Sequence, residues 1–127
     1  NYIRMPRRLK ELGSYAFHES ALKKITVYGK VELGETFKYC KKLKTVVLKE
    51  GVKELGEYVF IHCPKLRSVT VPKSVKGLVC IYDNIFYYRG LKCNLSKLTI
   101  KTPKNSEMYR YRKFWKKRYK IKVKVIK

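Results

Sequence analysis

The sequence predicts an α/β-type solenoid, in which short repeats stack along one axis, and three observations predict it. Four segments share one template of hydrophobic and aromatic residues: LKELGSYAF from Leu9, VELGETF from Val31, VKELGEYVF from Val52 and VKGLVCIYDNIF from Val75. Alternating apolar residues precede each of them and recur once more, at Ile3/Met5, Ile25/Val27, Val46/Leu48, Val69/Val71 and Leu98/Ile100. Successive runs lie 22, 21, 23 and 29 residues apart. Because no repeat can bury its own apolar residues, neighbouring repeats are expected to stack.

Each repeat is expected to open with a short strand. The spacing Leu-x-x-Val-x-Leu, as in Leu43, Val46 and Leu48, ends in an alternation of period two, which is typical of a strand with one apolar face. The residues between these hydrophobes then point to the opposite face. Aromatic residues follow at one common position, Phe17, Phe37, Phe60 and Phe86.

The four cysteines fall into two pairs. Cys40 and Cys63 share one repeat position, which predicts buried free thiols in adjacent coils. Cys80 and Cys93 flank an insertion in the fourth repeat and could close it as a disulfide in an oxidising compartment.

Residues 104–127 predict a basic cap, a helix followed by a strand, in the same domain as the solenoid of residues 1–103. Asn105 or Ser106 can cap a helix whose first turn holds Glu107, a favourable charge near the positive end of the helix dipole. Spacings of three, four and four residues place one stripe on the helix, Met108, Tyr111, Trp115 and Tyr119. This stripe is expected to cover the last coil. The strand is predicted from the alternation of Ile121, Val123 and Val125 with lysines.

The charge is strongly positive and uneven. Of 127 residues, 32 are Lys or Arg and 9 are Asp or Glu, a net charge of +23. Residues 101–127 hold 12 basic residues and one acid, Glu107. This pattern suits a polyanionic partner, although a lysine-rich solvated surface is the alternative. The 45% hydrophobic content excludes a disordered basic tail, and no apolar run is long enough for a membrane-spanning helix.

Catalytic motifs are missing from the sequence. The two histidines, His18 and His62, lie among scattered carboxylates, without a phosphate-binding loop, a nucleophile elbow or a Cys-x-x-Cys zinc clip. We therefore expect no enzyme, no cofactor and no metal site.

Glycine, proline and cysteine recur in register with the hydrophobic pattern, and here the chain resembles a known family. The segments IRMPRRLKELGSYAFHESALKKI from Ile3 and VTVPKSVKGL from Val69 are similar to the BspA-like leucine-rich repeat, over roughly residues 2–103. The repeat lengths fit the window of about 20 to 29 residues for leucine-rich repeats. The resemblance implies a right-handed leucine-rich repeat solenoid with short parallel strands on its concave face and loops or short helices on its convex face. About four to five coils and the C-terminal cap are expected.

Such repeats commonly present the residues between the strand hydrophobes to partners. The candidate concave binding face comprises Lys24, Thr26, Tyr28, Thr45, Val47, Lys49, Ser68, Thr70, Lys97, Thr99 and Lys101. Across the coils we expect Thr70 beside Thr99, Ser68 beside Lys97, and Pro72 beside Lys101. The strip could hold an acidic protein or a glycan, or its threonines could simply be good strand formers.

A second candidate surface is the basic face of the C-terminal helix, Arg110, Arg112, Lys113, Lys116, Lys117 and Arg118. It could follow the phosphates of a nucleic acid or lie on a membrane, with Trp115 or Tyr109 stacking on a base.

The resulting hypothesis is a non-catalytic protein-interaction or adhesion module with a protein or glycan ligand. The resemblance implies part of a bacterial or protist surface or secreted protein, with a cytoplasmic location as the alternative. The second hypothesis is polyanion binding, to nucleic acid or acidic glycan, through the basic C-terminal half. A third is a spacer between neighbouring domains.

Overall fold

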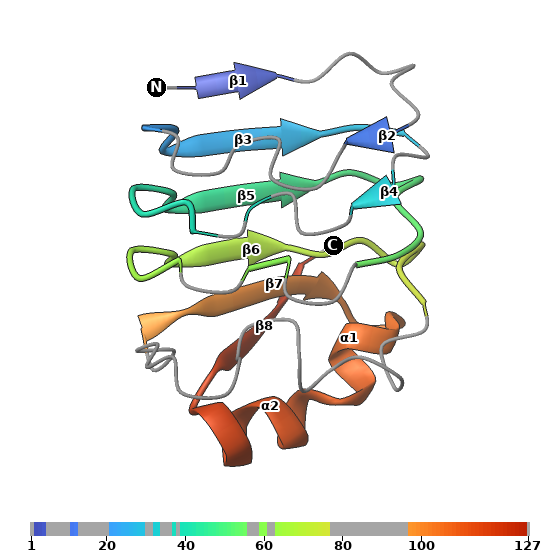
Figure 1. Cartoon of the computed structure of the whole chain (residues 1–127). Coiled ribbons are helices and arrows are strands. Elements are labelled where there is room, and N and C mark those ends of the chain that lie inside the picture. Colours follow the sequence, from blue (N-terminus) through green and yellow to red (C-terminus); the bar gives the residue numbers. More distant parts are fainter. Residues whose placement is uncertain are drawn as a thin grey trace.

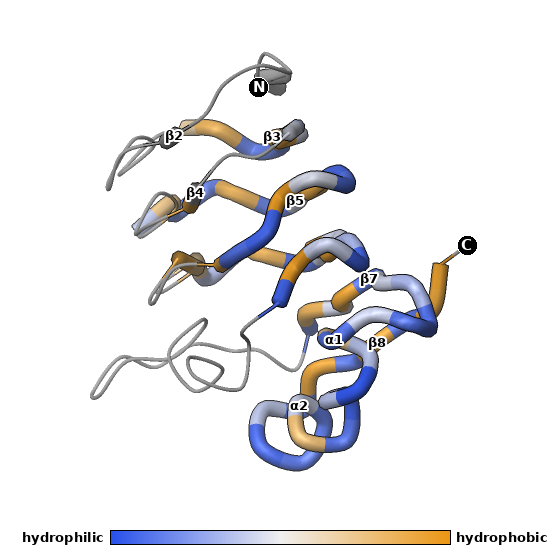
Figure 2. The backbone as a smooth tube through the Cα atoms, turned by 90° about the vertical axis from the view of Figure 1, so that its right-hand side faces the viewer, coloured by the Kyte–Doolittle hydropathy of each residue, from blue (hydrophilic) through white to orange (hydrophobic). Residues whose placement is uncertain are grey.

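The fold is that of a computed structural model, which describes residues 2–4, 11–12, 21–29, 32–33, 37, 39–55, 59–60, 63–76 and 97–126. The described residues form a six-stranded sheet in the order β1-β3-β5-β6-β7-β8, in which each neighbouring pair is parallel (Figure 1). Its strands are β1 (Tyr2–Arg4), β3 (Lys24–Val27), β5 (Thr45–Leu48), β6 (Ser68–Thr70), β7 (Thr99–Pro103) and β8 (Lys122–Ile126). A shorter parallel pair, β2 (Glu11–Leu12) and β4 (Glu32–Leu33), lies on the other side of the coils (Figure 2).

The strands align so that the predicted apolar positions form continuous rows. Ile25 pairs with Val46, which pairs with Val69, and the row goes on through Ile100 to Val123. The first four of these side chains are 0% exposed. The alternation in the sequence therefore predicted the strands and their buried face correctly, and the stack of repeats is confirmed for the described coils.

The register of β7 differs from the register that the sequence predicted. The sequence placed Leu98 beside Val69, whereas the structure pairs Ile100 with Val69, a shift of two residues. Thr102 consequently lies beside Val71, 31 residues earlier, and its Oγ1 donates a hydrogen bond to the Val71 carbonyl at 2.8 Å. A shift of two residues leaves every side chain on the same face, so alternation alone cannot detect it.

Aromatic rings and thiols fill the interior between neighbouring coils. Phe37 and Phe60 stack with their ring centroids 5.8 Å apart and their planes 3° from parallel. Cys40 and Cys63 are buried free thiols, as predicted, and the Cys63 Sγ donates to the Phe37 carbonyl at 3.0 Å. Burial raises the pKa of the Cys40 thiol from 9.0 to about 12. The predictions for Phe17, Phe86, Cys80, Cys93, His18 and His62 lie outside the described residues.

Two glycines that the repeat template did not single out shape the turns after β3 and β5. Gly29 has a φ of 74° and Gly51 a φ of 110°, conformations that other residues rarely adopt. A Cβ atom on Gly51 would lie 3.2 Å from the carbonyl carbon of Gly29. The Ser74 hydroxyl accepts from the Gly51 N–H at 3.0 Å and donates to the Val52 carbonyl at 2.6 Å, which links this turn to the next coil.

The C-terminal segment begins as predicted and then departs from one continuous helix. Ser106 caps α1 (Glu107–Arg110) by accepting from the Tyr109 N–H at 3.0 Å. The chain leaves helical geometry at Tyr111, with φ −95° and ψ 18°, before α2 (Arg112–Tyr119).

The predicted stripe of this segment faces the core. Met108 and Trp115 are 0% exposed, and Tyr111 and Tyr119 pack against the core while partly exposed. Because Thr99 pairs with Lys122, β8 continues the sheet beyond β7 in register.

Replacing Gly51 with alanine should destabilise the fold by roughly 1–3 kcal/mol, because alanine would have to adopt the positive φ of this position and its Cβ would crowd the Gly29 backbone. Urea unfolding followed by circular dichroism measures the loss. Lys53→Ala, an exposed substitution nearby, serves as the control. A midpoint for Gly51→Ala equal to that of the control would contradict this account of the turn.

Replacing Cys40 with alanine should make the free energy of unfolding fall less steeply as the pH rises above 9.0. Below pH 9.0 the thiol is protonated in both states, whereas between 9.0 and about 12 only the unfolded chain releases its proton, so unfolding becomes easier as the pH rises. The free energy of unfolding in urea, measured from pH 8 to 10.5, should fall more steeply in the native sequence, by up to about 1.4 kcal/mol per pH unit. Equal slopes in the two proteins would show that Cys40 is not protected from ionisation.

Candidate interaction surfaces

The outer face of the six-stranded sheet, the side opposite the buried rows, carries two rows of predicted binding residues. One row runs through Lys24, Thr45, Ser68, Thr99 and Lys122, and the other through Thr26, Val47, Thr70, Lys101 and Lys124. Most members from β5 to β7 are half-buried, and the lysines of β3 and β8 are exposed. The result is a strip with hydroxyls in its middle and lysines toward its ends.

The structure corrects the predicted rows at β7. Thr99 pairs with Ser68 instead of Thr70, and Lys101 pairs with Thr70 instead of Pro72. Each partner is thus two residues earlier in the chain than predicted. Lys97 precedes β7 and belongs to neither row. The two-residue shift of β7 explains these changed neighbours. The repeat before β7 is longer than the others, so the repeat pattern could not predict the alignment of this strand. Thr26 is also only 5% exposed, which leaves it little surface for a partner.

At the carboxyl ends of β3 and β5, the structure brings Tyr28 and Lys49 together as predicted. With Gly29 and Glu50 they line an open hollow of about 540 Å³. The carboxylate of Glu50 makes this hollow less uniformly basic than the C-terminal half.

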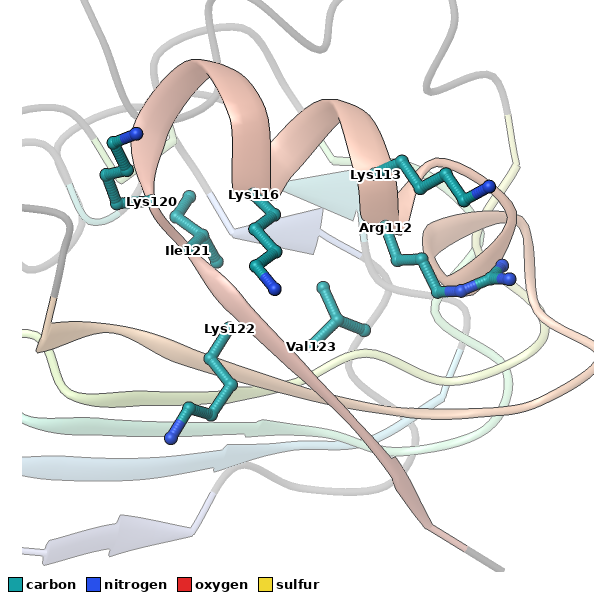
Figure 3. A pocket seen from close by; sticks show the side chains of 7 residues that line it. All are labelled: Arg112, Lys113, Lys116, Lys120, Ile121, Lys122 and Val123. Atoms are coloured by element: carbon teal, nitrogen blue, oxygen red, sulfur yellow. The ribbon is translucent and has the colours of Figure 1, made fainter.

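The predicted basic face of the helix is divided between two hollows. Arg112, Lys113 and Lys116 lie over a hollow of about 400 Å³ between α2 and β8. Lys120, Ile121, Lys122 and Val123 complete its lining (Figure 3). Lys117 and Arg118 instead line a second hollow with Phe114, and Arg110 belongs to α1.

Lys120 and Lys122 also belong to this basic surface, although the sequence did not predict them there. The chain leaves α2 through Lys120, in a left-handed conformation with φ 62°, and this turn directs β8 back beside the helix. The signal in the sequence was the alternation of lysines with Ile121 and Val123. It predicted the strand but not its place beside α2.

The prediction that Trp115 could stack on a base is wrong. Its side chain is 0% exposed and packs against Phe114 and Tyr119, with ring centroids 5.2 and 6.3 Å away. Tyr109 is half-buried, and the Arg112 guanidinium carbon lies 4.2 Å from its ring centroid, a cation–π distance. Trp115 therefore holds α2 on the core instead of contacting a ligand.

The described residues show neither a metal site nor a membrane-spanning helix. They contain no group of three or more His, Cys, Asp or Glu side chains placed to hold a metal ion. In the part of the chain that the structure covers, the helices are too short or too polar to cross a membrane. From Lys97 to Ile126, Glu107 is the only acidic residue, so both C-terminal hollows lie in a strongly positive region.

Parallel strands in register, one from each successive coil, define a repeat solenoid. The chain matches the family model described as a BspA type leucine rich repeat region, in six copies over residues 1–92 and 34–118, and it belongs to this family. No curated protein and no solved structure matches the chain. The predicted resemblance is thus confirmed, and the match reaches further than expected, into α2. Leucine-rich repeats generally mediate protein interactions, and this family is typically non-catalytic and usually surface-exposed or secreted.

Proposed function

We propose that the chain is a non-catalytic interaction module that binds an acidic partner protein across the outer face of its sheet, at the cell surface or after secretion. The observation that supports this proposal is the charge of that face. Strands β3, β5, β6, β7 and β8 contain four lysines on the outer rows and no acidic residue. Opposite charge on a partner would steer it to this strip and fix its orientation.

The solenoid that presents this face has about five coils, and the α1–α2–β8 segment closes it. Five coils and a closing strand account for the six strands of the sheet. The burial of Met108 and Trp115 supports the capping role, because these side chains cover the core that the last coil would otherwise expose. Residues 1–103 and 104–127 then form one domain.

Polyanion binding through the C-terminal half is the second candidate function. The two hollows lined by cations of α2 support it, because they suit nucleic acid or acidic glycans. Salt separates the candidates. Neutralising about six phosphates gives a log-log slope near −5 and a loss of about a thousandfold between 50 and 200 mM salt.

Charge reversal on the outer face tests the first proposal. Poly-L-glutamate serves as the acidic polypeptide probe, at 150 mM salt, with fluorescence anisotropy as the readout. The double variant Lys24→Glu/Lys101→Glu should bind the probe about tenfold more weakly, because both side chains face it. Lys41→Glu/Lys42→Glu changes the net charge equally at exposed positions outside the strands and should bind almost as well as the native chain.

Equal losses in the two double variants would show that net charge alone attracts the probe, and the outer-face proposal would then be wrong. Binding of a dT20 oligonucleotide that is much tighter than that of poly-L-glutamate, with a log-log salt slope of about −4 for six phosphates of a single strand, would favour the second candidate.

A further inference from the structure

The free edge of β8 is the first observation. β8 is the last strand of the described sheet and pairs with β7 on one side. The Lys122 N–H donates to the Leu98 carbonyl, so the backbone of Lys122 faces β7. Because backbone groups alternate in direction along a strand, the N–H and C=O groups of Val123 and Val125 are directed away from β7.

The two inward apolar rows also end on β8. One runs from Ile25 to Val123, and the other passes through Leu48, Val71 and Thr102 to Val125. Val125 is 45% exposed, whereas Leu48, Val71 and Thr102 are at most 1% exposed. Among the side chains described in these rows, the core is therefore least covered at this edge.

The hollow between α2 and β8 opens beside this edge and has an apolar floor with a basic rim. Ile121 and Val123 provide the floor, and Lys116 extends from the helix toward them (Figure 3). A volume of about 400 Å³ accommodates one or two side chains of a bound segment. Arg112, Lys113 and Lys122 add to the positive charge around it.

Charge decides which strand can occupy the edge. Lys122 and Lys124 alternate with Val123 and Val125, and lysines on an edge strand oppose pairing with another copy of the same basic strand. An acidic strand would instead be attracted to the edge, because its carboxylates would lie beside these lysines. Its apolar side chains would cover Val123 and Val125.

We propose that the edge of β8 and the adjoining hollow bind an extended acidic segment of a partner protein, which adds to the sheet as a further strand. Its alternate apolar side chains enter the hollow and cover Val125, and its carboxylates lie on the opposite face of the added strand, beside Lys122 and Lys124. The cations of α2 surround the hollow and add to the positive potential that attracts an acidic segment. Main-chain hydrogen bonds to Val123 and Val125 provide affinity, as in other cases of strand addition. The proposal rests on the chain being a protein-interaction module, and its site shares only Lys122 and Lys124 with the outer face.

A seven-residue peptide of alternating Glu and Val, acetyl-EVEVEVE-amide with a fluorescent label, is the probe. Its scrambled isomer EEVVVEE and two backbone-methylated versions, methylated at the Glu or at the Val amides, are the controls. One methylated version should bind at least about tenfold more weakly, because it loses two or more hydrogen bonds to β8. A loss at the Glu amides indicates parallel addition, and a loss at the Val amides indicates antiparallel addition.

Two neighbouring lysines of α2 provide matched variants of the chain. Lys116→Glu places a negative charge in the hollow and should weaken peptide binding by roughly tenfold, whereas Lys117→Glu, outside this hollow, should have much less effect. Lys41→Glu, an exposed substitution outside the strands, should leave peptide binding unchanged. The buried Trp115, the only tryptophan of the chain, verifies by its fluorescence that α2 stays folded in each variant.

Amide hydrogen exchange gives an independent readout. Saturating peptide should slow exchange at Val123 and Val125, while Lys124, whose backbone faces β7, should change little. The proposal is overturned if neither methylated peptide loses affinity, if the scrambled peptide binds equally well, or if Lys116→Glu and Lys117→Glu behave alike. It is also overturned if dT10 binds with greater affinity than the peptide and with the same dependence on Lys116. Failure of these tests leaves the outer-face experiment unaffected, because that experiment depends on Lys24 and Lys101, which none of these variants changes.

Discussion

The alignment of each parallel strand with the strand of the next coil is the constraint on which the rest of the structure depends. A repeat of this size cannot bury its apolar residues alone, so Ile25, Val46 and Val69 are excluded from water only when they stand side by side. A slip of one residue in any strand would turn its hydrophobes outward. Gly51 and Ser74, which link neighbouring turns, help to hold this alignment.

The same alignment separates stability from binding. Alternate residues of each strand form the core. The side chains of the outer rows are not needed to fill it, so lysines and hydroxyl residues can occupy these positions. At the C-terminal end the inward rows reach β8 but are incompletely covered, as the exposure of Val125 shows. The two proposed binding surfaces thus arise in different ways, one from outer-face residues that the core does not need and one from core residues that lack a further described strand at the edge.

Much of this architecture follows from the sequence. Period-two alternation located the strands, the recurrence of Cys40 and Cys63 located the buried thiols, and helical spacing predicted that Trp115 faces the core. The register of β7 did not follow, because a two-residue shift preserves alternation and a polar residue, Thr102, occupies a buried position. The hollow beside β8 was also missed, because it depends on the break at Tyr111 and the turn at Lys120, which are set by tertiary packing.

Cysteine cross-linking across β6 and β7 tests this alignment most directly. In a background with Cys80 and Cys93 replaced by serine, Ser68→Cys/Thr99→Cys should form a disulfide readily under mild oxidation, because paired strand residues lie within the required distance. Ser68→Cys/Lys97→Cys, which matches the alternative alignment, should stay reduced. A disulfide at 68–97 in place of 68–99 would contradict the register, and with it the rows of the outer face and the position of β8.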